Sequence, residues 1–290
     1  MKLSPTIIIT GANGFIGLAL VSRFSTIGYK VIALVHHLPI QKFEGVIYQE
    51  FDLSKQINEE LFNNADILIH CAYVKHSDNE KSFEININGS NNLIKISRLC
   101  GIKKNIFLSS LSARKDSLSE YGKQKYAIEQ LFKEKFDLIL RPGLVIGNGG
   151  LVRDIVDFIK KKKVVPVING GKQPIQTIYI NDLINAIDIA INENLSGEIM
   201  VADPNYVFYK DFYRAIFKHL KISPRFIYLP YHVISLVILL AKAIGLKLPI
   251  NKDNLLGLMS NYHIDTSEDL KKINLSLRTY KESISLTNFN

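Results

Sequence analysis

The residues with the clearest chemical potential are Tyr121 and Lys125, which lie four positions apart in a segment of helical spacing and so share one helix face. A phenol with a pKa of about 10 is a poor base at neutral pH, but an adjacent ammonium group favours its phenolate. Ser110, at the end of a predicted strand, could hydrogen-bond the same substrate oxygen. Together they predict proton exchange with a hydroxyl group. Because Tyr-x-x-x-Lys also occurs by chance in many helices, this interpretation needs support from other motifs.

A glycine-rich turn, Thr10-Gly11-Ala12-Asn13-Gly14-Phe15-Ile16-Gly17, gives that support. Gly11 allows a tight turn, Gly14 lets the backbone approach a pyrophosphate, and Gly17 lets a helix pack closely on a strand. The phosphates would lie at the helix N-terminus. Since the turn lies between a predicted strand and a predicted helix, we expect it to bind a dinucleotide rather than to be an ordinary loop. Hydride transfer to or from a nicotinamide would then accompany the proton exchange.

The end of the second predicted strand, at residues 30–35, bears on which dinucleotide is bound. An acid at this point would bond the ribose 2′-hydroxyl of NAD, but Val35 stands there instead. His36 and His37 follow, and imidazoles can approach a 2′-phosphate that a carboxylate would repel. We therefore favour NADP over NAD. The alternative is that the two histidines belong to a solvated loop.

Strand and helix patterns alternate along the first part of the chain. We expect strands at 6–10, 30–35, 65–71, 105–109 and 137–141, and helices after residue 14, at 78–100, at 121–136 and near 151–163. This alternation predicts an α/β fold with a Rossmann-type, doubly wound parallel sheet. Beyond residue 203 the pattern becomes helix-rich, at 212–220, 233–244 and 254–259. We expect a dinucleotide-binding domain at 1–148, to which 174–203 returns, and a smaller C-terminal substrate lobe of 149–173 and 204–290.

Composition excludes several classes of protein. The chain has 290 residues, of which 47% are hydrophobic and 22% charged, unlike a disordered tail, a collagen or a disulfide-rich miniprotein. The 36 Lys and Arg against 27 Asp and Glu give a net charge of +9, which favours phosphate-bearing partners. Because the lysines are scattered, we expect nucleotides and no nucleic acid. With only Cys71 and Cys100 and no secretory signal, we expect a cytoplasmic protein without disulfides, and no metal site.

One apolar stretch, residues 232–248, requires a separate interpretation. Its run from Leu236 to Ala241 is interrupted by Lys242. A membrane-spanning helix needs about 20 mostly apolar residues, so we expect no transmembrane segment. We predict an apolar helix that ends at Gly245 and packs on the protein. The alternative is peripheral contact with an anionic membrane surface.

As a set, the motifs resemble the extended short-chain dehydrogenase/reductase family, in particular its NAD(P)-dependent epimerase/dehydratase branch acting on nucleotide sugars. The resemblance extends over almost the whole chain. The motifs that carry it are Thr10 to Gly17, Asp52-Leu53, His70-Cys71-Ala72, Asn86 to Leu93, Ser109-Ser110, Tyr121-x-x-x-Lys125, Arg141-Pro142-Gly143 and Tyr179 to Leu183.

The resemblance implies roles for individual residues. Ser110, Tyr121 and Lys125 match the catalytic trio, Asp52 and Leu53 match the pair that contacts adenine, and residues 71–74 match the strand end along the cofactor. Without the family, Asp52 would be read as a turn residue and Asn86 as a polar residue on a helix surface. The residues expected at the cofactor are Gly11, Asn13, Gly14, Phe15, Ile16, Gly17, His36, His37, Asp52, Leu53, Cys71, Ala72, Tyr73, Val74, Asn86, Tyr121, Lys125, Pro142 and Gly143.

Two departures from the family pattern concern the substrate. Only ten residues separate Ser110 from Tyr121, and Arg114 replaces the aromatic residue that usually follows the serine. Leu144 stands where the sugar epimerases carry a substrate-binding asparagine, which weakens a 4-epimerase assignment. The chain looks more like the branch found in surface polysaccharide synthesis, which includes 4-keto-6-deoxy nucleotide-sugar reductases.

The function that we expect is an NAD(P)-dependent oxidoreductase or epimerase acting at C4 of a nucleotide-diphosphate sugar. It would be either a 4-epimerase or a 4-keto-6-deoxy-sugar reductase. The family also implies a homodimer, formed through the helices at 78–100 and 121–136. The alternative function is a non-catalytic NAD(P)-binding protein, such as a redox sensor or an assembly subunit. The short loop after Ser110 favours this alternative, and the intact trio opposes it.

Overall fold

The computed structural model describes residues 5–75, 81–132, 135–243, 252–260 and 262–289. The chain divides into two compact units. Unit 1 consists of Met1–Asp116, Glu120–Arg141 and Ile184–Met200, and unit 2 consists of Ser117–Ser119, Pro142–Leu183 and Val201–Asn290.

A seven-stranded sheet forms the centre of unit 1, in the order β3-β2-β1-β4-β5-β6-β11. All neighbouring strands from β3 to β6 are parallel. This is the order of a doubly wound, dinucleotide-binding sheet, so the predicted Rossmann-type α/β fold is confirmed. The strands are β1 (Thr6–Thr10), β2 (Lys30–Val35), β3 (Ile47–Glu50), β4 (Ile67–His70), β5 (Lys104–Leu108), β6 (Leu138–Pro142) and β11 (Gly197–Val201).

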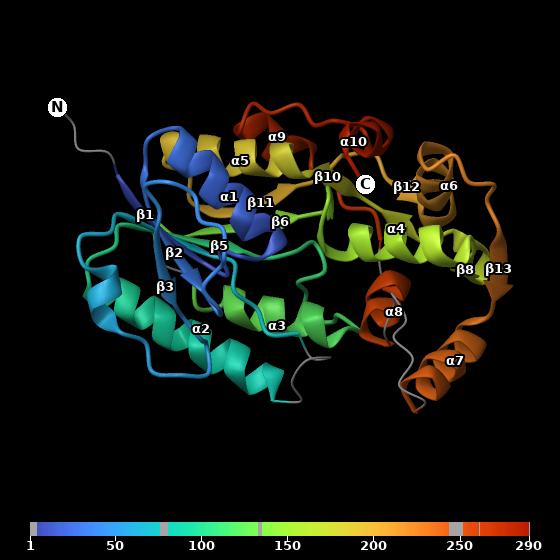
Figure 1. The fold of residues 1–290 in the computed structure, drawn as a ribbon, viewed down its shortest axis with the longest axis horizontal. Coiled ribbons are helices and arrows are strands. Elements are labelled where there is room, and N and C mark those ends of the chain that lie inside the picture. Colours follow the sequence, from blue (N-terminus) through green and yellow to red (C-terminus); the bar gives the residue numbers. More distant parts are fainter. Residues whose placement is uncertain (1–4, 76–80, 133–134, 244–251, 261, 290) are drawn as a thin grey trace. The chain divides into compact units, whose positions relative to one another are not determined.

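Helices cover both faces of this sheet. Figure 1 shows α1 and α5 on one face and α2 and α3 on the other. Because β1 lies between these two layers, Ile7, Ile8 and Ile9 are fully buried, which explains its continuous apolar run. The helices of this unit are α1 (Phe15–Thr26), η1 (Glu59–Phe62), α2 (Ser82–Leu99), α3 (Glu120–Glu129) and α5 (Ile180–Asn192), the last of which begins in unit 2.

The predicted strands at 6–10 and 30–35 coincide with β1 and β2, but the helix predicted at 121–136 is wrong in length. After α3 ends at Glu129, the chain continues in tight turns, in which the amide of Phe132 donates to the carbonyl of Glu129 at 3.0 Å. Phe132 remains buried with Ile128 in one core cluster. The apolar spacing therefore extends beyond the helix, because turn residues also contribute to the core.

Strand β3 was not predicted from the sequence. It lies at the edge of the sheet and pairs only with β2. Its four residues, Ile47–Glu50, are exposed or half-buried, so they show neither a buried apolar run nor a regular alternation. Edge strands of this kind give a weak sequence signal.

The described residues of unit 2 form helices and three small two-stranded sheets, which pair β7 with β10, β9 with β12 and β8 with β13. Its core brings together α4 and α6, whose largest buried side chains are Phe212, Tyr213 and Phe217. The helix-rich prediction missed the short strands. The elements are β7 (Leu144–Ile146), α4 (Gly150–Lys162), β8 (Val165–Ile168), η2 (Asn169–Gly171), β9 (Pro174–Ile175), β10 (Thr177–Tyr179), β12 (Val207–Phe208), α6 (Tyr209–His219), β13 (Phe226–Leu229), α7 (Tyr231–Ala243), α8 (Lys252–Met259), α9 (Ser267–Lys272) and α10 (Tyr280–Leu286).

Helix α7 corresponds to the apolar stretch that we identified in the sequence. Ile234 is buried and Ile238 packs against the core of unit 2, but Leu236, Leu239 and Leu240 are more than half exposed. The prediction of a helix packed on the protein therefore holds for one face only. Gly245, the predicted end of the helix, lies outside the described residues. None of the helices in the described ranges is long and apolar enough to cross a membrane.

Candidate active site

The expected site residues of unit 1 gather at one edge of its sheet. Strands β1, β2, β4 and β5 are parallel, so their carboxyl ends meet at this edge. The glycine turn follows β1, the two histidines follow β2, residues 71–74 follow β4, and Ser109-Ser110 follow β5. In doubly wound sheets, ligands bind at the carboxyl ends of the strands, where the strand order reverses. That point lies between β1 and β4 here.

The turn from β1 into α1 has no room for side chains at two of its glycines. Gly11 has a φ of +65°, and a Cβ there would lie 2.9 Å from the Cα of Ala72. A Cβ at Gly17 would collide with the carbonyl oxygen of Gly11. Gly14 is the N-cap of α1 and offers no side chain to bond the first amides of the helix. The turn therefore fits the phosphates of a dinucleotide, since no side-chain cap bonds the first amides of α1 and its glycines carry no side chains.

The other expected residues of the turn lie around this helix start. Asn13 is exposed, and Phe15 and Ile16 are half-buried in the first turn of α1. The side-chain amide of Asn13 reaches the backbone carbonyl of His37 at 3.5 Å. The glycine turn and the histidine pair are therefore neighbours at the sheet edge.

A buried cluster of hydrogen bonds holds the ends of β1 and β4 together. The hydroxyl oxygen of Thr10 accepts the amides of Cys71 at 3.2 Å and Ala72 at 3.1 Å, and lies 2.8 Å from Nδ1 of His70. Burial lowers the pKa of His70 to about 3, so its ring is neutral. Because the Thr10 oxygen already accepts two amides, its hydroxyl group donates to Nδ1 of His70. The proton of the neutral ring is then on Nε2, which donates to the hydroxyl of Ser90 at 2.9 Å. We call these groups the strand-end clamp; the sequence motifs contain them without indicating this role.

The histidine pair lies next to Asp52. Nδ1 of His36 is 2.8 Å from Nε2 of His37, and Nε2 of His36 is 3.5 Å from a carboxylate oxygen of Asp52. Partial burial disfavours the carboxylate of Asp52, but bonds from the amide and hydroxyl of Ser54 and the nearby His36 hold its pKa below the ordinary value. Asp52 is thus both a turn residue and part of the expected adenosine end.

The neighbouring residue, Leu53, has its side chain in a core cluster. Its carbonyl oxygen approaches α2 so closely that a Cβ at Gly89 would lie 2.5 Å from it. This contact explains the glycine in the Asn86 to Leu93 motif. It also means that Leu53 can face a cofactor only through its backbone.

Lys125 is held in a buried and largely aromatic environment. Its ammonium donates to the carbonyl of Leu108 at 2.7 Å and lies 4.7 Å from the ring centre of Phe107 and 5.1 Å from that of Tyr73. Burial lowers the pKa of Lys125 to about 8, against opposing effects of Cys71 and Glu129. The group still carries its charge at neutral pH.

Tyr121 lies on the same face of α3, as the spacing predicted. The Lys125 ammonium is 5.8 Å from its ring centre. The ring of Tyr73 packs edge-to-face against that of Tyr121, with the ring centres 5.2 Å apart. Ser110 lies two residues beyond Leu108, the last residue of β5, whose carbonyl anchors Lys125. The hydroxyl of Ser110 accepts the amide of Ser112 at 3.1 Å.

Asn86 and Gln124 connect the loop after β4 to α3. Asn86 is buried, and its side chain exchanges two bonds of 2.8 Å with the backbone of Val74. The side-chain oxygen of Gln124 accepts from Asn86 at 2.8 Å and from the hydroxyl of Tyr73 at 3.0 Å. Asn86 is therefore not a polar residue on a helix surface. Sequence reasoning missed Gln124, although its position between Tyr121 and Lys125 on α3 could have suggested it.

A second missed network fixes α3 to the sheet. Glu129, fully buried, accepts the hydroxyl of Ser109 at 2.5 Å, and Nε and Nη2 of Arg141 at 2.8 and 2.6 Å. Hydrogen bonding to Glu129 raises the pKa of Arg141 above its ordinary value. Arg141 also pairs with the exposed Glu198 of β11 at 3.2 Å. The network connects β5, α3, β6 and β11.

The last two expected cofactor residues lie in unit 2. Pro142 is the final residue of β6, and the amide of Gly143 donates to the carbonyl of Val201 at 3.1 Å. A Cβ at Gly143 would lie 2.5 Å from the carbonyl oxygen of Gln176. The glycine of the Arg-Pro-Gly motif therefore permits close packing of two backbones within unit 2.

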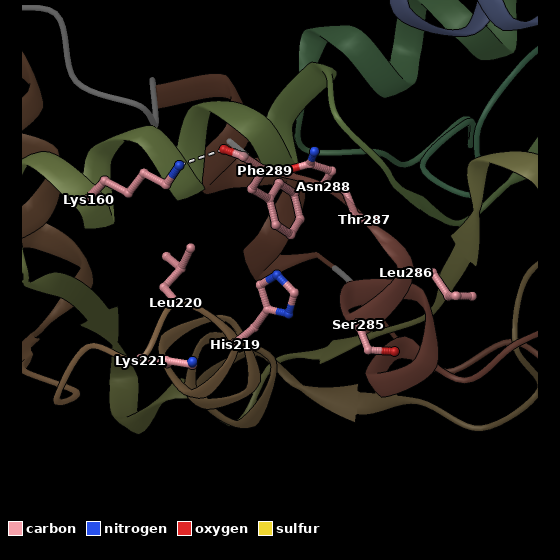
Figure 2. A pocket seen from close by; sticks show the side chains of 9 residues that line it. All are labelled: Lys160, His219, Leu220, Lys221, Ser285, Leu286, Thr287, Asn288 and Phe289. Carbon is pink, nitrogen blue, oxygen red and sulfur yellow. Dashed lines mark hydrogen bonds between the residues drawn. The ribbon is translucent and has the colours of Figure 1, made fainter.

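A hollow of about 450 Å³ in unit 2 contains none of the expected site residues (Figure 2). Lys160 and the end of α6 line it together with residues 285–289. The ammonium of Lys160 donates to the carbonyl of Phe289 at 2.5 Å, and Arg153 donates to the same oxygen at 3.0 Å. These cations thus hold the C-terminal segment. Among the described residues, no group of His, Cys, Asp or Glu is suited to hold a metal ion.

Comparisons with known proteins bear on the fold and the family of the chain. The chain is 25% identical to the UDP-glucose 4-epimerase of Vibrio cholerae, over 66% of this chain and 68% of that protein. It is 29% identical to the ceramide reductase of Caulobacter vibrioides, over 60% of this chain and 57% of that one. The solved structure of MoeE5 with UDP-glucuronic acid and NAD superposes with a TM-score of 0.77, at 16% identity and over 97% of both chains. The model of the NAD dependent epimerase/dehydratase family matches residues 7–202. With that match over about two thirds of its length, the chain belongs to the NAD-dependent epimerase/dehydratase family.

Proposed function

We propose that the chain is an NAD(P)-dependent oxidoreductase or epimerase acting at C4 of a nucleotide-diphosphate sugar. The observation that carries the proposal is the position of Tyr121 beside the charged Lys125, at the sheet edge that also holds the glycine turn. The Vibrio cholerae relative is named as a UDP-glucose 4-epimerase, which supports the choice of C4.

In this proposal the chain's own residues handle the proton. In the oxidative direction the Tyr121 phenolate takes the proton of the C4 hydroxyl, and in the reductive direction the neutral Tyr121 phenol gives a proton to the C4 oxygen as the ketone is reduced. Ser110 hydrogen-bonds the same oxygen in both directions. The Lys125 ammonium favours the phenolate electrostatically, and its bond to Leu108 keeps it in place. The amides at the start of α1 bind the dinucleotide phosphates. The nicotinamide, when bound, supplies the hydride acceptor or donor.

We propose NADP as the preferred cofactor, with NAD as the alternative. His36 and His37 are exposed at the end of β2 and lie beside Asn13, where an adenosine ribose is expected. Nε2 of His36 also lies 3.5 Å from a carboxylate oxygen of Asp52, the residue matched to the adenine contact. Tighter binding of NADPH than of NADH in a fluorescence titration would support this preference, and the reverse order would remove it.

The decisive experiment combines cofactor titration with substrate addition. Purified protein is loaded with NADPH or NADH and mixed with UDP- and dTDP-sugars, including 4-keto-6-deoxy forms, while the nicotinamide absorbance is followed. Products are separated by chromatography. NADPH oxidation that requires a keto-sugar would identify a reductase, and an epimerised sugar without net oxidation would identify an epimerase. Tight cofactor binding without turnover of any sugar would favour the non-catalytic alternative.

The Tyr121→Phe variant tests the proposed mechanism. We expect turnover to fall by about 10²–10⁴-fold, because general acid–base catalysis is lost. Cofactor affinity should stay within about twofold, since the ring and its contact with Tyr73 are retained. A variant with unchanged turnover would exclude Tyr121 as the proton-transfer group.

The wider setting of the reaction is also a proposal. We place the enzyme in surface polysaccharide synthesis, on the Arg-Pro-x-Leu-Val sequence that begins at Arg141 and on the apolar C-terminal lobe. We also propose a cytoplasmic location. The homodimer expected through α2 and α3 gains support from Phe83, which α2 leaves 46% exposed. Light scattering of the purified protein tests the dimer directly.

A second candidate substrate is an alcohol or ketone with a lipid portion. The Caulobacter vibrioides relative is named as a ceramide reductase, and α7 exposes leucines in unit 2. Adding a long-chain keto-lipid to the same assay separates this candidate from the nucleotide sugar.

A further inference from the structure

The outward face of α7 is apolar although it is exposed. Leu236, Leu239 and Leu240 are 54%, 64% and 56% exposed, and their spacing places them on one side of the helix. Ile234 and Ile238 occupy the opposite side, against the core of unit 2. A surface helix normally carries polar residues on its outer face, and a helix that is apolar all round is normally covered. We call Leu236, Leu239 and Leu240 the α7 face.

The sequence that contains α7 is strongly basic. Lys and Arg are scattered along the whole chain, but residues 212–252 contain seven of them and no Asp or Glu, so most of the net charge of +9 comes from this stretch. Lys221 and Arg225 are exposed before α7, and Lys252 is exposed at the start of α8. An apolar helix face within a cationic stretch has the composition of an interfacial, membrane-binding helix.

Strand β13, which directly precedes α7, adds residues of the type found at lipid–water boundaries. Tyr228 is 52% exposed, and the ammonium of Lys210 lies 4.7 Å from its ring centre. Ile227 is 49% exposed. Tyrosine and lysine have an apolar body and a polar tip, so both are favoured where apolar chains meet charged headgroups. Figure 1 shows β13 leading into α7 at the rim of unit 2.

We propose that unit 2 docks through the α7 face on an anionic lipid surface. The leucines would enter the boundary between headgroups and acyl chains, and Lys221, Arg225 and Lys252 would approach the lipid phosphates. Docking on a second copy through the same face is disfavoured, because a two-fold contact would bring together two stretches, residues 212–252 of each copy, that carry Lys and Arg but no Asp or Glu. The inference stands on unit 2 alone and does not depend on the proposed reaction.

The test is co-sedimentation of the full chain with vesicles. Vesicles of phosphatidylcholine alone are compared with vesicles of phosphatidylcholine and phosphatidylglycerol, at low and high salt. We expect binding to the anionic vesicles only, weakened by salt because exposed charges are screened. Failure to bind anionic vesicles at low salt would overturn the proposal.

Two variants separate the apolar and the charged contributions. We expect the double variant Leu239→Ser/Leu240→Ser to bind at least about tenfold more weakly, since the apolar contact is lost. The double variant Arg225→Gln/Lys252→Gln should bind several-fold more weakly and show a smaller salt dependence. Because all four side chains are exposed, circular dichroism melting should show unchanged stability.

A matched control replaces exposed apolar residues elsewhere. Ile27 and Leu286 are 38% and 56% exposed, and the variant Ile27→Ser/Leu286→Ser should bind vesicles like the wild type. Equal loss in this control would show a general effect of surface polarity and contradict the proposal. Light scattering that shows a dimer dissociated by Leu239→Ser/Leu240→Ser would assign the face to a second copy instead.

Discussion

The two halves of the candidate site in unit 1 are built on opposite principles. The turn after β1 works by the absence of side chains, because Gly11 and Gly17 leave no space for a Cβ and free the amides of α1. The α3 half works by side chains held from several directions, with Lys125 bonded to Leu108 and Glu129 bonded to Ser109 and Arg141. A side chain added in the turn should therefore destabilise the first half, whereas a side-chain hydrogen bond removed at α3 should destabilise the second half.

Glu129→Gln should break the α3 half and give the largest effect. The substitution removes a fully buried charge that pairs with Arg141, and breaking such a pair from one side costs about 3–5 kcal/mol of unfolding free energy. Glu198→Gln is the matched control, because Glu198 pairs with the same guanidinium but is 43% exposed at its side chain. It should cost less than about 1 kcal/mol. Urea unfolding measures both, and similar losses would show that burial does not decide the strength of this network.

Gly17→Ala should disrupt the turn after β1, with a somewhat smaller loss of unfolding free energy than Glu129→Gln. The new methyl group collides with the carbonyl of Gly11, so α1 must shift away from β1, at a cost of about 2–3 kcal/mol. Gly14→Ala is the graded comparison, since a Cβ there would lie 3.1 Å from the same oxygen. Unfolding free energies and NADPH dissociation constants should both rank Gly17→Ala as the more damaging. The opposite order would contradict the assigned packing role.

The smallest expected effect concerns the α3 half of the site, and it is a pH dependence of the unfolding free energy. The pKa of Lys125 falls from 10.5 to about 8 on folding because of burial. Between these values the unfolded chain binds more protons than the native one, so the unfolding free energy should rise with pH, by about 1–2 kcal/mol from pH 8 to 10. Above that range, the buried hydroxyls of Tyr209 and Tyr213, whose pKa values are raised by burial, act in the opposite direction.

Replacing the lysine tests this assignment. Lys125→Met should lose most of the rise, and Lys123→Met, at an exposed position on the same helix, should retain it. A rise that persists in Lys125→Met would have to come from another group, such as Lys104, whose pKa is also lowered by burial.

The comparison also explains what the sequence could predict. The constraints on the glycine turn are local, so the spacing of Gly11, Gly14 and Gly17 between a strand and a helix was sufficient. The pair Tyr121 and Lys125 was accessible for the same reason, because one helix turn brings them together. Gln124 and Glu129 were missed because their partners come from distant positions, such as Asn86 and Arg141, and no local pattern marks a buried polar residue as satisfied.

The same reasoning applies to the elements that were misjudged. Apolar spacing predicted too long a helix at α3 because Phe132 packs into the core from a turn. Strand β3 has too few buried residues to leave a pattern. For α7, composition predicted an apolar helix but could not show that only one of its faces would find a partner within unit 2.

The histidine of the strand-end clamp makes the unfolding free energy of unit 1 depend on pH in the acid range. Its histidine is neutral, and its pKa is lowered from 6.5 to about 3 by burial, so mild acidification cannot charge it while unit 1 is folded. Protonation requires His70 to leave the interior. Unfolding therefore takes up this proton, and the clamp contributes a loss of stability as the pH falls from 6.5 towards 3. Acidification towards pH 3 therefore lowers the unfolding free energy of unit 1 through a group that stays uncharged for as long as the unit is folded.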